Sequence, residues 1–159
     1  MTEVDVRRAH PYEADASKII RSYLEDIVSR WHGRPATAEE VDEALEDEPA
    51  TDLSEPDGYL AIAYVSDVPA GVGGVRFLEN GIAELTKVFT VRDRRGNGVG
   101  SIVLDHLEQV ARDAGCSSIR LDTRSDLHEA CRMYEKRGYL RVAAFSDVVY
   151  SDRWYRWDL

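Results

Sequence analysis

The stretch VFTVRDRRGNGVGSIVL, residues Val88–Leu104, changes character at its centre. An apolar run rich in β-branched residues gives way to three arginines and three glycines, and then to the first residues of a helical apolar pattern. A strand, a bare turn and a helix in this order leave backbone N–H groups at a helix N-terminus, where the helix dipole favours anions. Gly96 and Gly98 allow a positive φ and the close approach of a ligand, and the arginines add positive charge. The segment therefore predicts a phosphate-binding site.

Spacing separates three classes of phosphate-binding turn. A P-loop ends in Gly-Lys-Ser/Thr, whereas this turn reads Gly98-Val99-Gly100-Ser101 and has no lysine. A dinucleotide-binding fingerprint needs GxGxxG inside a parallel βαβ unit, whereas here GxGxG follows a strand that we expect in an antiparallel meander. The first class is excluded and the second fits poorly.

Helical and strand patterns alternate around this turn without a repeat or a low-complexity linker. Helices are expected at 12–31, 37–45, 99–114 and 126–137, and strands at 59–65, 71–78, 82–91, 117–123, 139–145 and 154–159. Thr37 with Glu40, and Asp126 with Glu129, have the spacing of helix capping boxes. This order predicts an α/β (α+β) fold, with a mixed central β-sheet flanked by helices, in a single domain of residues 1–159.

The composition narrows the choice of partners. A net charge of −10 over 159 residues argues against binding to nucleic acid, which needs a basic face. The negative charge suits a cationic substrate. Ten carboxylates and no basic residue lie in residues 39–57. The alternative is that these acids only keep the protein soluble. No apolar segment predicts a membrane span or a signal peptide, so we expect a cytoplasmic protein. The spacing of Cys116 and Cys131 predicts neither a metal site nor a disulfide framework.

Two motifs in the second half of the chain carry a family resemblance. Arg95-x-x-Gly98-x-Gly100 matches the pattern R/Q-x-x-G-x-G/A of the GNAT family of N-acetyltransferases, and HEACRMYEKRGY, residues 128–139, is similar to the family segment (E)AxxxYEKxGF. The resemblance implies the GNAT fold and acetyl-CoA as co-substrate. It also implies cofactor contacts from Phe89, Thr90 and Val91 at a bulge in the strand, and from Arg95, Gly96, Asn97, Gly98, Val99, Gly100 and Ser101 in the turn. Leu127 stands where the family frequently has an asparagine that contacts the cofactor.

Acetyl transfer to an amine needs a neutral amine, a polarised thioester carbonyl and a protonated leaving thiolate. A backbone N–H at the bulge can polarise the carbonyl. The resemblance implies that Tyr134, in the YEK segment, is the general acid; the alternative is an aromatic ring that packs the helix on the sheet. It also implies that Glu84 is the general base, directly or through water; the alternative is an ion pair with a base such as Arg120.

The resemblance leaves the acceptor open. We expect an N-acetyltransferase that acts on a small-molecule primary amine, with a protein or peptide amine, a longer acyl group, or a non-catalytic acyl-CoA-binding module as alternatives. Trp154, Tyr155 and Trp157 near the C-terminus have faces that can meet a cation. The alternative for these aromatic residues is packing in the core or in a homodimer interface.

Overall fold

The computed structural model describes residues 3–159. Its elements, in chain order, are β1 (Val4–Ala9), α1 (Ala14–His32), α2 (Ala38–Asp47), β2 (Gly58–Val65), β3 (Val68–Phe77), η1 (Glu79–Gly81), β4 (Ile82–Thr90), η2 (Arg92–Arg94), α3 (Val99–Asp113), β5 (Ser118–Thr123), α4 (His128–Lys136), β6 (Leu140–Val142) and β7 (Arg153–Asp158). In this part of the chain no helix combines the length and the apolar character needed to cross a bilayer.

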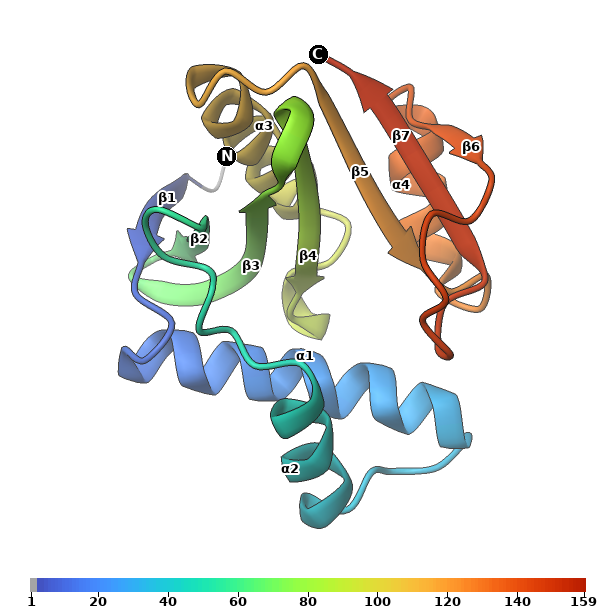
Figure 1. The fold of residues 1–159 in the computed structure, drawn as a ribbon. Coiled ribbons are helices and arrows are strands. Elements are labelled where there is room, and N and C mark those ends of the chain that lie inside the picture. Colours follow the sequence, from blue (N-terminus) through green and yellow to red (C-terminus); the bar gives the residue numbers. More distant parts are fainter. Residues whose placement is uncertain (1–2) are drawn as a thin grey trace.

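The seven strands form one sheet in the order β1-β2-β3-β4-β5-β7-β6. Strands β4 and β5 are its parallel pair, and the other neighbours run antiparallel. The β4–β5 ladder covers only residues 82–84 and 118–120, after which the two strands diverge toward α1 (Figure 1). The expected mixed sheet is confirmed, and it is split at its centre.

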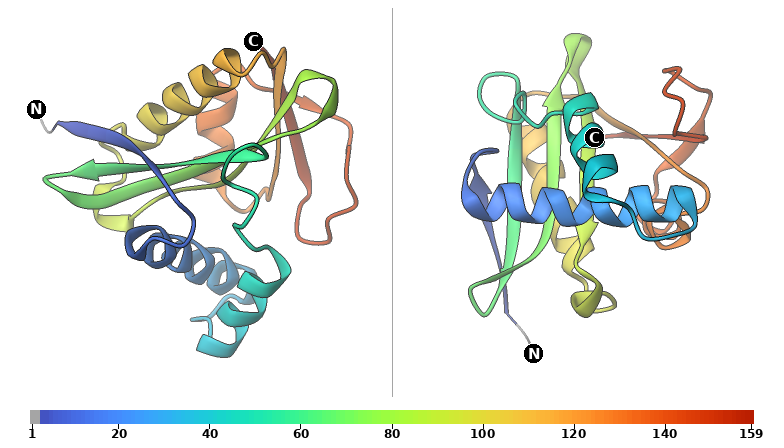
Figure 2. Two further views of the ribbon diagram at one scale, coloured as in Figure 1. Left: turned by 60° about the vertical axis from the view of Figure 1, so that its left-hand side comes forward. Right: turned by 90° about the horizontal axis from the view of Figure 1, so that it is seen from below.

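Helices cover both faces of the sheet. Helices α1 and α2 pack on one face and α3 and α4 on the other (Figure 2). The side with α1 and α2 has a core that includes Leu24, Val41, Leu53, Leu60 and Ile62. The side with α3 and α4 has a core that includes Val103, Leu107, Ile119, Leu121 and Tyr134. The two apolar layers fix the sheet between them, so the split between β4 and β5 is bounded by helices from both sides.

Strand β1 is missing from the sequence-based expectation. Its sequence, VDVRRA, carries arginines on an edge strand and lacks a clean alternation of apolar and polar residues. Arg7 and Arg8 lie over the rings of Tyr64 and Tyr59 on β2, at 4.2 and 4.9 Å from the ring centroids. Because of these cation–π contacts, charged residues pack on the sheet where an alternating strand pattern would have apolar ones, so the pattern does not reveal β1.

The two expected capping boxes have different outcomes. At α2, the Glu40 N–H donates to Thr37 Oγ1 at 3.2 Å and the Thr37 N–H donates to Glu40 Oε1 at 2.9 Å, so that box is confirmed. At α4 the prediction is wrong, because the N-cap is Leu127 and has no side-chain cap bond. Asp126 and Glu129 instead accept from arginines, which compete for the carboxylates that a capping box needs.

Candidate active site

A cavity of about 310 Å³ lies where β4 and β5 separate. Its lining comes from α1, β4, the turn after β4, β5 and α4. Among the expected site residues it brings together Phe89, Thr90, Arg95, Gly96, Gly98, Val99, Gly100, Ser101 and Tyr134. Val91, Asn97 and Glu84 are expected site residues that do not line it.

The bulge in β4 lies earlier than expected. Residues 87 and 88 together oppose Gly73 of β3, so the expectation of a bulge at Phe89, Thr90 and Val91 is wrong in position. Lys87 has a φ of 56° and is almost fully buried, and its Nζ donates to the Glu48 carbonyl at 3.0 Å, at the C-terminal end of α2. The bulge therefore occurs where the chain turns a lysine side chain toward the end of a helix, whose carbonyls favour a cation.

Beyond the bulge, one edge of β4 faces the split without a partner strand. The Val91 N–H donates to the Ala70 carbonyl of β3 at 2.9 Å, so the backbone groups of Phe89 and Val91 point to β3. By alternation, Thr90 directs its backbone groups into the cavity, and Val88 also lines it. The Thr90 carbonyl accepts from Arg95 Nε at 3.0 Å on that side. Val88 is not among the expected site residues because its side chain reads as core, yet it lines the cavity.

The turn after β4 supplies free N–H groups. The first backbone bond of α3 runs from the Ile102 N–H to the Gly98 carbonyl at 3.1 Å, so the N–H groups of residues 99–101 precede the helical ladder. Gly96 and Gly98 have φ values of 81° and 80°, with open space where a Cβ would project. Asn97 stabilises the turn through its side-chain amide, which donates to the Arg94 carbonyl at 3.3 Å. Donor N–H groups, open space and a helix N-terminus fit a diphosphate.

The charges beside the turn are unequally neutralised. Arg95 Nη2 lies 3.5 Å from Asp26 Oδ2, and its guanidinium lies 5.5 Å from the Phe89 ring centroid. Arg94 lines the cavity and has no ion pair within residues 3–159. Arg95 therefore secures the turn against α1 and β4, while Arg94 keeps its charge available for an anion.

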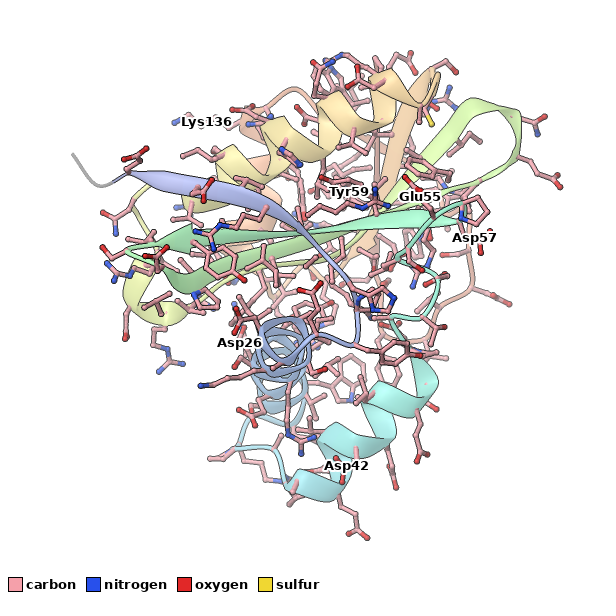
Figure 3. The ribbon with its side chains drawn as sticks, turned by 90° about the vertical axis from the view of Figure 1, so that its left-hand side faces the viewer. Asp26, Asp42, Glu55, Asp57, Tyr59 and Lys136 are labelled. Atoms are coloured by element: carbon pink, nitrogen blue, oxygen red, sulfur yellow. The ribbon has the colours of Figure 1, made fainter. Side chains whose placement is uncertain are left out.

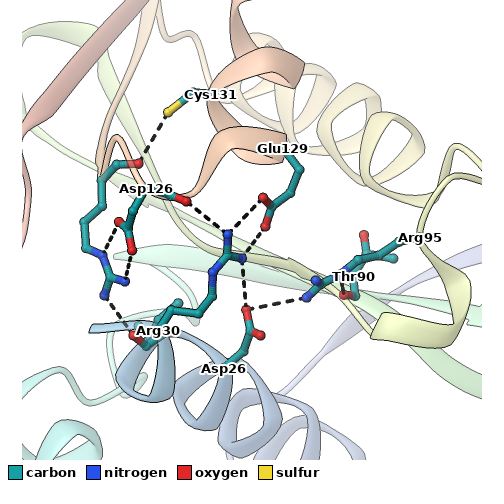
Figure 4. A network of polar contacts seen from close by, with 9 residues as sticks. Asp26, Arg30, Thr90, Arg95, Asp126, Glu129 and Cys131 are labelled. Carbon is teal, nitrogen blue, oxygen red and sulfur yellow. Dashed lines mark hydrogen bonds and ion pairs between the residues drawn. The ribbon is translucent and has the colours of Figure 1, made fainter. Parts of the chain in front are cut away.

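An arginine network joins α1 to α4 across the cavity (Figure 4). Arg30 of α1 donates to both carboxylate oxygens of Glu129, at 3.0 Å for Nη2, and to the Asp126 carbonyl at 3.1 Å. Its Nη1 also lies 3.6 Å from Asp26 Oδ2. Hydrogen bonding from Arg30 lowers the pKa of Glu129 to about 2. Arg124 adds a second tie, because it donates to the Ile27 carbonyl of α1 at 2.8 Å.

Tyr134 lines the cavity from α4. Its ring packs between Tyr139 and Tyr155, with centroids 5.6 and 6.0 Å away, and the residue is 5% exposed. No hydrogen-bond partner for the hydroxyl is found in the described part of the chain. Burial raises the pKa of Tyr134 above its usual value. The phenol is thus protonated at neutral pH and free to donate.

Glu84 lies at the last paired position before the strands split. Arg120 Nε donates to its Oε2 at 2.9 Å, and Arg76 Nη1 lies 3.9 Å from Oε1. This ion pair is the alternative that the sequence raised for Glu84. The role of Glu84 as a base stays a prediction.

The acidic segment 39–57 is less free than its composition indicates. Figure 3 places Asp42 on α2 and Glu55 and Asp57 on the loop before β2, so the acids do not gather at one point. Asp42 pairs with Arg21 and Glu55 with Arg8, at 2.8 and 2.9 Å. The C-terminal aromatic residues Trp154, Tyr155 and Trp157 do not line the cavity.

The sequence matches the model of the acetyltransferase (GNAT) family over residues 21–139. This chain belongs to the GNAT family. Among its relatives, the N-acetyltransferase YjcF of Bacillus subtilis is 31% identical over 78 residues, which are 49% of this chain and 53% of that protein. The IAA acetyltransferase of Azospirillum brasilense is 31% identical over 90 residues, 55% of this chain and 58% of that protein. The matches thus span about half the length of these relatives.

Solved structures show the same fold. The PaiA N-acetyltransferase from Thermoplasma acidophilum, in complex with coenzyme A, superposes with a TM-score of 0.76 at 13% identity and covers 99% of both chains. The acetyltransferase of the GNAT family from Staphylococcus aureus superposes with a TM-score of 0.78 at 15% identity, covering 98% of this chain and 99% of that one. The expected GNAT fold is confirmed.

Proposed function

We propose that this protein transfers an acetyl group from acetyl-CoA to the primary amine of a small molecule. One observation carries the proposal: the same cavity is lined by the cationic glycine turn and by Tyr134, whose hydroxyl has no hydrogen-bond partner in residues 3–159. The turn suits the phosphates of coenzyme A and the phenol suits a leaving thiolate. A relative solved with coenzyme A has the same fold, which agrees with this choice of co-substrate.

Residues of this chain have separate tasks in the reaction. The N–H groups of residues 99–101 and Arg94 bind the diphosphate. The Val88 carbonyl and the Thr90 N–H hydrogen-bond the pantetheine arm, because the Thr90 carbonyl already accepts from Arg95. The Val88 N–H polarises the thioester carbonyl as the amine nitrogen attacks its carbon. When the C–S bond breaks, the thiolate takes the proton of the Tyr134 hydroxyl.

Glu84 is our proposed base. Because its carboxylate is ion-paired outside the cavity lining, it accepts the amine proton through water rather than by direct contact. Arg120 and Arg76 keep the carboxylate in place for that water.

Two alternatives remain for the acceptor and the activity. A protein or peptide amine would use the same chemistry, and a non-catalytic acyl-CoA-binding module would need only the turn. The free Tyr134 hydroxyl favours catalysis, because a phenol that lines the cavity and donates to no protein group is available to protonate a thiolate.

The direct test follows the release of free coenzyme A with a thiol reagent. Purified protein, acetyl-CoA and a panel of cationic, neutral and acidic amines, with a lysine-containing peptide, are mixed at neutral pH. We expect turnover with at least one small cationic amine, with kcat/KM falling as salt rises. Turnover with the peptide alone would contradict the acceptor class, and acetyl-CoA binding without turnover of any amine would support the non-catalytic alternative.

A further inference from the structure

Three carboxylates line the cavity, and they differ in how they are neutralised. Asp26 is ion-paired with Arg30 and Arg95, and Glu129 is ion-paired with Arg30. Asp122 has no basic partner within residues 3–159. A carboxylate in a cavity without a cation is unusual, because a buried or partly buried charge is costly unless it is paired.

The position of Asp122 brings it to the split in the sheet. It lies on β5, two residues after the last position paired with β4. Ile119 and Leu121 belong to the core on the side of α3 and α4, so by alternation Asp122 projects from the face toward α1. Its carboxylate therefore stands on the face of the sheet opposite α4, in the lining of the cavity.

The two oxygens of Asp122 have different surroundings. Oδ1 accepts from Ser151 Oγ at 2.5 Å, which secures the carboxylate to the loop before β7. Oδ2 accepts no hydrogen bond from residues 3–159. It is not a fully buried atom, so a ligand or water can reach it. Asp122 lines the cavity and Oδ2 keeps its accepting positions free, while the bond to Oδ1 holds the carboxylate in place.

Tyr23 of α1 supplies a second free polar group at this part of the cavity. Its hydroxyl has no hydrogen-bond partner in residues 3–159, and its ring packs edge-on against Phe89 with a centroid distance of 6.0 Å. Burial raises the pKa of Tyr23, and the negative charge of Asp122 adds to the effect, as it does for Tyr134. Asp122 is therefore within electrostatic reach of both phenols.

We propose that Asp122 is the counter-ion of the acceptor, which binds as a small organic cation with its ammonium on Asp122 Oδ2 and a hydrogen bond to the Tyr23 hydroxyl. The cavity then has two recognition sites of opposite sign, with Arg94 and the turn for the anionic co-substrate and Asp122 for the cationic acceptor. The proposal rests on the function proposed above and narrows its substrate class. The cation is recognised inside the cavity and not by the acidic segment 39–57.

Binding experiments separate this proposal from catalysis. The protein is saturated with coenzyme A, and phenethylamine, spermidine and the neutral phenethyl alcohol are titrated by calorimetry. We expect the wild type to prefer phenethylamine to the alcohol, and Asp122→Asn to weaken the binding of both amines at least tenfold. The affinity for acetyl-CoA should stay within twofold.

Two further variants test whether the negative charge of Asp122 is what binds the amines. Ser151→Ala removes the bond to Oδ1 and keeps the carboxylate, so it should bind amines much better than Asp122→Asn does. Asp158→Asn removes the same charge from a largely exposed site on β7 and should bind amines like the wild type. Equal amine binding by the wild type and a folded Asp122→Asn, or no preference for the amine over the alcohol, would overturn the proposal. Absence of acetyl-CoA binding by the wild type would instead overturn the proposed function.

Discussion

Replacement of Tyr134 by phenylalanine removes one oxygen and little else. The ring contacts with Tyr139 and Tyr155 stay, and the hydroxyl leaves no protein donor or acceptor unpaired. The free energy of unfolding should therefore change by less than about 0.5 kcal/mol. General acid catalysis contributes roughly 10²–10⁴-fold, and burial raises the pKa of this phenol further above that of a thiol, about 8.5. An unfavourable proton transfer puts the contribution at the lower end, so kcat should fall about 10²-fold, or roughly 2.7 kcal/mol in the barrier.

Thiol release at saturating acetyl-CoA and amine measures this effect. Because the pKa of Tyr134 is raised, the wild-type kcat should show no loss from its deprotonation between pH 7 and 10. Tyr150→Phe is the matched control, since Tyr150 is 54% exposed and outside the cavity, and it should leave kcat unchanged. A Tyr134→Phe protein with wild-type kcat and wild-type stability would refute the role of the hydroxyl.

Three further substitutions test the network, the core and the base. Glu129→Gln removes a carboxylate whose pKa is lowered to about 2 by Arg30; the carboxylate stabilises the fold above about pH 4.5 and loses that effect as the pH falls toward 2. The melting temperature of the variant should thus lie below the wild type at pH 7 and meet it near pH 2, and a constant gap would contradict the tie between α1 and α4. Arg137→Met leaves the carboxylate of Glu108, 3% exposed, without its cation and should cost about 3 kcal/mol in chemical denaturation; a loss under about 1 kcal/mol would show that the buried pair contributes little. Glu84→Gln should shift the limb of the pH–rate profile on which activity rises with pH, and an unmoved limb would assign the proton to another base or to bulk water.

Elements with local signals were predictable from the sequence. The capping box at α2 needs only two residues three positions apart, and the glycine turn needs only its own segment. The predicted position of the bulge in β4 is wrong because the bulge accompanies a contact between Lys87 and the end of α2, and these residues are 39 positions apart in the sequence. Asp126 and Glu129 were misassigned because arginines elsewhere in the fold bind their carboxylates.

Site residues that belong to a sequence motif were predictable, and those that only the sheet topology brings to the cavity were not. Tyr134 and the turn carry family motifs, whereas Asp122 is one acid in the short strand SIRLDT and Tyr23 reads as part of an apolar helix face. Only the split between β4 and β5 turns these two residues into lining of one cavity. An acid that alternates with the apolar residues Ile119 and Leu121, on the other face of the same strand, is the signal that could have indicated Asp122.

Calorimetric titration with acetyl-CoA, on the wild type and on Gly98→Val, tests the phosphate-binding turn most directly. The wild type should bind one acetyl-CoA per chain, with an affinity that falls as salt rises. Gly98 has a φ of 80°, so a β-branched residue strains the turn and projects into the space above its N–H groups; binding should fall at least tenfold in a variant that remains folded. Saturable binding by the wild type and its loss in the variant are the predicted results, and unchanged affinity in a folded Gly98→Val protein would contradict the site.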